Sequence, residues 1–186
     1  MSTLFSVLAQ CEHKNVEPST SAQPSSRLWA SIKVDPIGQG LERERAPLAV
    51  ALVVDVSGSM HGPPIEHVIR SSEILIDLLG ERDQLAIVTF ASHAGVRCGL
   101  TPADATGKAQ LRRVLQTITA EGNTNLHGGL ELAAGVLVTA PSGLRRAMVV
   151  MSDGKPNVGL SSATDLAAYV TGLKLAVSSL GFGLQH

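Results

Sequence analysis

The sequence predicts an α/β fold of the doubly wound type, with a mostly parallel sheet, one antiparallel edge strand and helices on both faces. From Pro47 onward, short apolar runs of strand length alternate with segments of helical period. Aromatic residues make up 3% of the chain and hydrophobic residues 44%, so Leu, Val, Ile and Ala must fill the core. That composition is typical of parallel strands covered by helices on both faces. Right-handed crossovers are expected between the strands.

The N-terminal part of the chain predicts little globular structure. Residues 1–26 are expected to form a flexible tail, because "EHKNVEPSTSAQPSS" combines Pro, Ser, Thr and charged residues without an apolar period. Residues 27–46 predict an extra strand and a linker, since apolar and polar residues alternate in "RLWASIKV" before turn residues and charges. We therefore expect the main domain over residues 47–186.

The first half of this domain predicts a strand, a helix and a hairpin. "LAVALVV" is typical of a buried strand. Apolar residues then recur at helical spacing after Pro64, which suits a first helical turn, and Gly80 is placed to end that helix. "QLAIVTFA" and "GVRCGL" predict two further strands. The tight "SHAG" turn between them predicts an antiparallel edge hairpin.

The second half predicts two helices, a strand, a short helix and a last strand. The helices are marked by apolar residues over Leu111–Ile118 and Leu126–Leu137. "RRAMVVMS" predicts a strand, and a short helix is expected over Ala163–Tyr169, with Ser162 and Asp165 as a capping pair. "LKLAVSSLGFG" is the last predicted strand. Because the sequence stops just after it, we expect the domain to be incomplete at its C-terminal end.

Polar side chains follow two of the predicted strands directly. Asp55 ends the strand "LAVALVV" and is followed at two-residue spacing by Ser57 and Ser59, while Asp153 follows "RRAMVVMS". Thr124 lies in "GNTNL", at the start of a predicted helix. Ligands of open parallel sheets bind beyond the carboxyl ends of the strands. If the two strands are neighbours, these three loops meet at one edge.

The combined donor set indicates a hard divalent cation. Taken singly, each residue is typical of a helix cap or a turn, but two carboxylates and three hydroxyls in three matching loops favour a shared site. Mg²⁺ and Mn²⁺ prefer oxygen ligands, whereas a structural Zn²⁺ site takes Cys or His. The two carboxylates offset the double positive charge of the ion, and the remaining protein ligands are neutral hydroxyls. The metal therefore stays electrophilic toward an outside carboxylate. We therefore expect Mg²⁺ or Mn²⁺ at this site.

These motifs resemble a known family. "DVSGSM" is similar to the Asp-x-Ser-x-Ser motif of the von Willebrand factor A (vWA) domain, and "GNTNL" and "MSDGKPN" are similar to its separate Thr and Asp motifs. The resemblance covers roughly residues 47–184. It implies a Rossmann-like fold and a metal-ion-dependent adhesion site, in a stand-alone protein of bacterial type. The family's sheet normally continues with one more strand and a final helix, so the resemblance also implies a C-terminally truncated domain.

The resemblance also implies a role for each site residue. Ser57 and Ser59 should bind the metal directly, Thr124 directly or through water, and Asp55 and Asp153 mainly through bridging waters or hydrogen bonds. An Asp or Glu of a partner protein should complete the metal's ligands. Family members use this site for binding rather than turnover, so we expect a protein-binding domain and not an enzyme.

Two other classes of function stay open. One is a phosphotransferase of the haloacid dehalogenase type with Asp55 as nucleophile. That chemistry needs a second carboxylate two residues on, where this sequence has Ser57. The other is an interaction module without a metal. His61 and His127 flank the proposed site, and solvated loop positions are the favoured interpretation of both.

Composition excludes several partners and locations. The net charge of −1 offers no basic field for nucleic acid or an anionic membrane surface. No phosphate-binding glycine motif follows a predicted strand. No apolar run approaches the length of a membrane span, and "LFSVLAQC" lacks the basic region of a secretory signal. We therefore expect a cytoplasmic protein, and a surface or secreted role stays open as the alternative if a signal or anchor is missing from the sequence.

Overall fold

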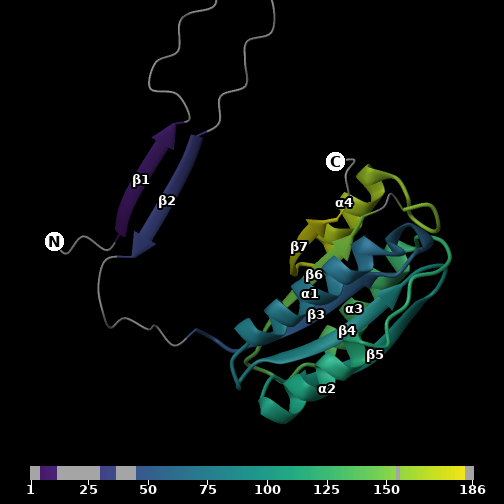
Figure 1. Ribbon diagram of the computed structural model, residues 1–186, viewed down its shortest axis with the longest axis horizontal. Helices are drawn as coiled ribbons and strands as arrows, with labels where there is room; N and C mark the ends of the chain where they lie inside the picture. Colours follow the sequence, from purple (N-terminus) through teal and green to yellow (C-terminus); the bar gives the residue numbers. More distant parts are fainter. Residues whose placement is uncertain (1–4, 12–29, 37–44, 154–155, 183–186) are drawn as a thin grey trace, which may run out of the picture. The chain divides into compact units, whose positions relative to one another are not determined.

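The computed structural model describes residues 5–11, 30–36, 45–153 and 156–182. The chain divides into two compact units, Met1–Arg45 and Ala46–His186. The first unit contains an antiparallel pair of strands, β1 (Phe5–Cys11) and β2 (Ala30–Pro36) (Figure 1).

Of these two strands, the sequence predicted β2 and did not predict β1. β2 falls in the segment 27–46 for which we predicted a strand, whereas β1 lies where we predicted a flexible tail. β1 contains Phe5 and Val7, an aromatic and a β-branched residue of the types enriched in strands. β2 supplies its pairing partner. The predicted linker, residues 37–44, lies outside the described residues.

The second unit is built around a five-stranded sheet whose order is β5-β4-β3-β6-β7. β3, β4, β6 and β7 are parallel, and β5 pairs antiparallel with β4. The strands are β3 (Leu48–Asp55), β4 (Gln84–Phe90), β5 (Ala94–Pro102), β6 (Arg145–Ser152) and β7 (Ala176–Gly181). The helices are α1 (Pro63–Leu78), α2 (Ala105–Leu115), α3 (Leu126–Val138) and α4 (Ala163–Gly172). The predicted fold class is confirmed.

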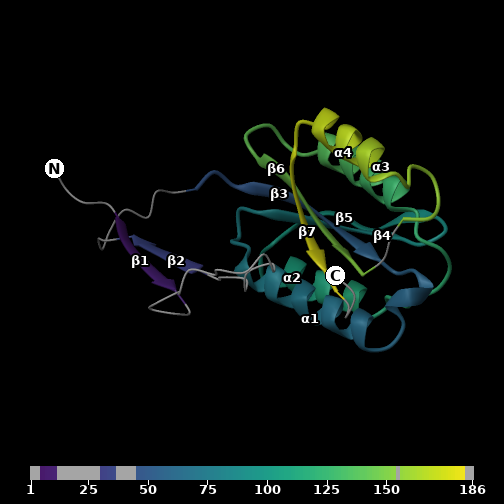
Figure 2. The ribbon, with the colours of Figure 1, turned by 90° about the horizontal axis from the view of Figure 1, so that it is seen from above.

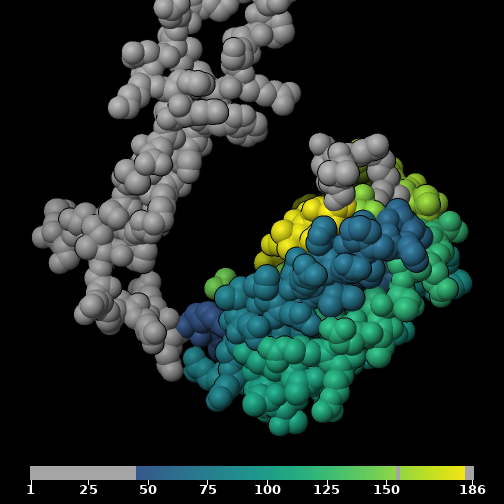
Figure 3. Space-filling model, viewed as in Figure 1, coloured from purple at the N-terminus to yellow at the C-terminus, as the bar shows by residue number. Residues whose placement is uncertain are grey.

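The central strand β3 divides the core into two layers. Its even-numbered residues from Val50 to Val54 pack with α1 and α2, while Ala49, Ala51 and Val53 pack on the other face with α3. Figure 2 shows α1 and α2 below the sheet and α3 and α4 above it. In space-filling form, α1 and α2 cover one face side by side (Figure 3). Successive side chains of a strand point to opposite faces of the sheet. Because both faces of β3 are covered by helices, every position is apolar and the sequence shows one continuous apolar run.

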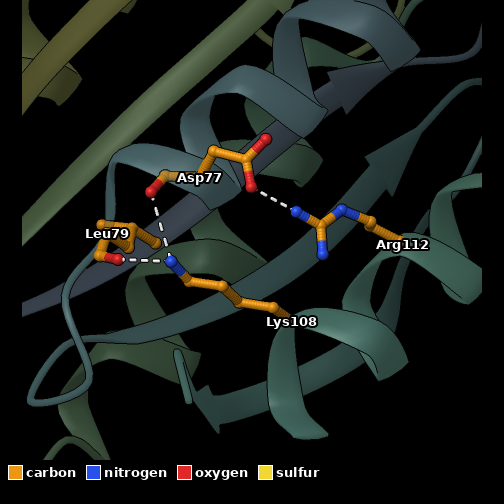
Figure 4. Close-up of polar contacts among 4 residues, drawn as sticks. All are labelled: Asp77, Leu79, Lys108 and Arg112. Carbon is orange, nitrogen blue, oxygen red and sulfur yellow. Dashed lines mark hydrogen bonds and ion pairs between the residues drawn. The ribbon is translucent and has the colours of Figure 1, made fainter. Parts of the chain in front are cut away.

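Polar contacts hold the C-terminal end of α1 against α2. Lys108 Nζ donates to the backbone oxygens of Asp77 and Leu79, at 3.2 and 2.6 Å, and Arg112 forms an ion pair with the Asp77 carboxylate (Figure 4). A cation at the end of a helix satisfies its last carbonyls and interacts favourably with its dipole. α1 ends at Leu78 with Leu79 as its C-cap, so Gly80, which we expected to stop the helix, directly follows the cap.

A buried aspartate connects the same region to the start of the sheet. Asp83 is 1% exposed, and its carboxylate accepts hydrogen bonds from the backbone N–H groups of Leu48, at 2.9 Å, and Gly80, at 2.7 Å. Its backbone oxygen accepts a third from Ala103 N at 2.8 Å. Asp83 therefore fixes the chain where β3 and β4 begin. The sequence analysis did not single it out.

The other predicted elements are present, with shifted ends. α2 begins at Ala105, before the predicted apolar stripe, because the Asp104 side chain caps it by accepting from Gly107 N. α4 begins as predicted, with Ser162 accepting from Asp165 N, and extends to Gly172. Within the described ranges, no helix is long and apolar enough to cross a lipid bilayer.

Candidate functional site

The sheet topology places a switch point at the carboxyl ends of β3 and β6. β3 leads through α1 to β4 on one side, and β6 leads through α4 to β7 on the other. The two crossovers use opposite faces of the sheet, since α1 and α4 pack on different layers (Figure 2). Such a switch point is where doubly wound sheets bind ligands. Asp55 and Asp153 lie directly at it.

The loop after β3 presents three oxygen-bearing side chains. Asp55 is 0% exposed, and its Oδ1 accepts a hydrogen bond from Ser57 N at 2.9 Å. Ser57 is 1% exposed and begins a short 3₁₀ helix, Gly58–Met60, whose Met60 is buried. This turn brings Ser57 Oγ to within 3.1 Å of Ser59 Oγ. The two-residue spacing therefore places both hydroxyls on one side of the loop.

The loop after β6 contacts this first loop through side chains. Ser59 Oγ donates to Asp153 Oδ1 at 2.9 Å, and Ser152 Oγ donates to Asp55 Oδ2 at 2.5 Å. β3 and β6 are hydrogen-bonded neighbours in parallel register, with Val54 opposite Met151, so their ends are level. The strand pairing thus brings together carboxylates that lie almost a hundred residues apart in the sequence.

The third loop, which carries Thr124, is held to the other two by backbone contacts. Gly58 N donates to the backbone oxygen of Gly122 at 2.9 Å. Thr124 N donates to Asn157 Oδ1 at 2.9 Å, and Asn157 N donates back to the Thr124 oxygen at 3.0 Å. Thr124 is 5% exposed. All three loops are therefore joined pairwise at one edge of the sheet.

The structure thus gathers the loops that the sequence analysis selected. Ser57, Ser59 and Asp153 are linked through hydrogen bonds of their side chains, and the Asp55 carboxylate accepts from Ser57 N. The backbone of Thr124 bonds Asn157, in the loop that carries Asp153. Their role as metal ligands stays a prediction. In the part of the chain that the structure describes, no group of three or more His, Cys, Asp or Glu side chains is placed to hold a metal. A cation at this edge would thus depend on hydroxyl ligands as well as the two carboxylates.

Two residues of the site were missed by sequence reasoning. The Ser152 hydroxyl donates to the Asp55 carboxylate. Asn157 accepts from the backbone N–H of Thr124 and donates to its backbone oxygen. Both lie in or beside the motif "MSDGKPN", so their nearness to Asp153 was the available signal. What they contact depends on strand register and loop path, which that motif does not reveal.

The flanking histidines differ in their surroundings. His61 is exposed, as expected of a loop residue. The His127 ring packs edge-on against Tyr169 of α4, with centroids 4.6 Å apart. Partial burial, and secondarily the charge of Glu131, raise the pKa of Tyr169 above its usual value. His127 therefore helps to join α3 to α4.

The comparison with known families agrees with this geometry. The family model of the von Willebrand factor type A domain matches residues 49–186, a range that contains all three loops. The chain belongs to this family. The resemblance inferred from the three motifs is therefore confirmed at the level of the family and the fold.

Individual relatives match the same vWA region. The uncharacterised protein YfbK of Escherichia coli is 31% identical over 143 residues, and the match spans 75% of this chain and 24% of that protein. Human inter-alpha-trypsin inhibitor heavy chain H4 is 30% identical over 150 residues, spanning 75% and 16%. The chain thus matches a quarter or less of the length of both relatives.

A solved structure shows the same fold. An aerotolerance-related membrane protein from Bacteroides fragilis aligns with a TM-score of 0.62 and 26% identity, over 74% of this chain and 68% of that one.

Proposed function

We propose that this vWA domain binds Mg²⁺ or Mn²⁺ and, through the metal, captures an Asp or Glu side chain of a partner protein. The observation that supports this proposal is the hydrogen-bonded row of oxygens formed by Ser57 Oγ, Ser59 Oγ and Asp153 Oδ1 at the switch point of the sheet, beside which the Asp55 carboxylate accepts from Ser57 N. Thr124 joins it on the loop held by Asn157.

The donor chemistry fits a hard cation. Carboxylate and hydroxyl oxygens are the ligands that Mg²⁺ and Mn²⁺ prefer, and Mg²⁺ usually binds few protein carboxylates while keeping several waters. Ser57, Ser59 and Thr124 would hold the ion, with Asp55 and Asp153 supplying its two compensating charges. When bound, the cation supplies an electrophilic centre for an incoming carboxylate. The exposed side of Ser59 gives such a group access from solvent.

The burial of Asp55 favours binding over phosphoryl transfer. A carboxylate nucleophile must reach its substrate, yet Asp55 is 0% exposed and both of its oxygens accept hydrogen bonds, from Ser57 N and Ser152 Oγ. Its neighbour two residues on, Ser57, has no carboxylate to act as general acid and base. We therefore propose a binding domain and not an enzyme.

A serine pair offers a clean test. Ser59→Ala removes one exposed hydroxyl of the site, whereas Ser142→Ala removes an exposed serine hydroxyl in the turn between α3 and β6, at the opposite end of the sheet. Isothermal titration calorimetry with Mg²⁺ and Mn²⁺ should show wild-type binding in Ser142→Ala and binding weakened by about tenfold or more in Ser59→Ala, because a polar contact to a charged group contributes about 1.5–3 kcal/mol. Equal affinities in the two variants would refute the metal site.

A further inference from the structure

A groove begins beside the proposed metal site and follows β5 away from it. Its first part is a cleft of about 540 Å³, with Val56, Glu121 and Gly122 at the end nearest the site loops. A second hollow of about 420 Å³ continues it, and both are lined by Val96 and Arg97. We call this combined surface the Arg97 groove.

The groove shares its wall with the metal site. Val56 lies between Asp55 and Ser57 in the chain, and its backbone oxygen accepts from Glu121 N at 2.7 Å. Gly122, on the other wall, accepts from Gly58 N at 2.9 Å. A polypeptide segment whose side chain reached the metal would therefore have the groove directly beside it.

Charge is unevenly distributed along the groove. Glu121 is exposed at the end near the metal site, whereas Arg97 and Arg113 are exposed in the further part. Arg97 donates one hydrogen bond, from Nη2 to the backbone oxygen of Thr117 at 3.5 Å. A guanidinium has five N–H donors, so this contact orients the side chain and leaves donors for a ligand. The far end of the groove thus suits a carboxylate.

We propose that the Arg97 groove binds a second acidic residue of the same partner segment whose first carboxylate reaches the metal. This inference depends on the proposed function and specifies the partner's chemistry: an extended segment with two separated acidic residues. Arg97 and Arg113 bind the second carboxylate, and Val96, which is 44% exposed, contacts the intervening chain. Glu121 disfavours a negative charge between the two acidic positions, which gives selectivity by repulsion.

The test compares two labelled peptides by fluorescence anisotropy in Mg²⁺. One is a short oligoglutamate, and the other is a Gly-Ser peptide of equal length with a single Glu. The double variant Arg97→Glu/Arg113→Glu should bind oligoglutamate about fivefold or more weakly than wild type, since two partly exposed ion pairs contribute about 1 kcal/mol in total. Its affinity for the single-Glu peptide should change little. Glu121→Gln should bind oligoglutamate more tightly.

The control is Arg145→Glu/Arg146→Glu, which makes the same change of charge with two exposed arginines at the opposite end of the sheet, where β6 begins. If both double variants lose the same affinity for oligoglutamate, overall charge explains the effect and the groove is refuted. Absence of any oligoglutamate binding in Mg²⁺ refutes it as well. Failure of the proposed function looks different, because peptide binding would then be unaffected by Mg²⁺ and by Ser59→Ala.

Discussion

Asp55→Asn is the substitution that separates a metal-binding role of this carboxylate from a structural one. Asparagine has nearly the same size and keeps an oxygen that accepts from Ser57 N, as Asp55 Oδ1 does at 2.9 Å. Its amide can donate to Ser152 Oγ, which lies 2.5 Å from Asp55 Oδ2. The change therefore removes the negative charge and leaves the hydrogen-bonding pattern nearly intact.

The expected effect depends on the cation. Without Mg²⁺ we expect the free energy of unfolding to change by less than about 1.5 kcal/mol. Asp55→Asn loses the extra strength of charge-assisted hydrogen bonds. It also loses the free-energy cost of burying a charge at a position that is 0% exposed, and the two effects offset each other. At a Mg²⁺ concentration of about a hundred times Kd, wild type gains about 2.7 kcal/mol from binding. For a chain of this length that corresponds to a rise in Tm of roughly 5–10 °C.

The assay is differential scanning calorimetry of both proteins in EDTA and in increasing Mg²⁺, with NaCl added to match the ionic strength. Wild type should show a Tm that increases with Mg²⁺, and Asp55→Asn should show a Tm that does not. Parallel increases in the two proteins would refute the reasoning. A flat Tm in wild type would refute the metal site itself.

Three further substitutions test the fold that positions the site. Asp83→Ala leaves two backbone N–H groups without their carboxylate acceptor, so we expect a loss of about 3 kcal/mol in urea unfolding; a change below about 0.5 kcal/mol would contradict this. Gly129→Ala places a Cβ 2.8 Å from Phe90 Cδ1 and should destabilise by about 1–3 kcal/mol. Gly135→Ala, on the same helix with open space, should stabilise by up to about 1 kcal/mol. Equal effects of both alanines would contradict the close packing of α3 on β4.

The sequence was sufficient to predict the alternation of strands and helices because β3 is buried on both faces and reads as one apolar run. It also located Asp55 and Asp153, since each follows such a run directly. The structural role of Asp83 was not predicted, because the local sequence "GERDQ" is typical of an exposed, charged turn. Its burial follows from backbone N–H groups of Leu48 and Gly80, of which Leu48 lies 35 positions away in the sequence.

The partners of the site residues were also beyond sequence reasoning. Ser152 meets Asp55 because β3 and β6 pair with Val54 opposite Met151, and a shift of one residue would turn the side chain to the other face. Asn157 reaches Thr124 through a loop whose path no local pattern specifies. Local patterns thus identified candidate ligands, whereas long-range register determined which of them meet.

The same contacts bear on how tightly the site would hold the proposed cation. The backbone bonds between Gly58 and Gly122, and between Thr124 and Asn157, join the three loops without using the side-chain oxygens that we propose as metal ligands. The entropy of ordering the loops is therefore lost on folding and not again on metal binding. Binding of the proposed cation would then mainly require it to exchange water molecules for the hydroxyls of Ser57 and Ser59, which already bond one another and Asp153. On this proposal the two carboxylate charges, more than loop ordering, would determine the affinity for Mg²⁺.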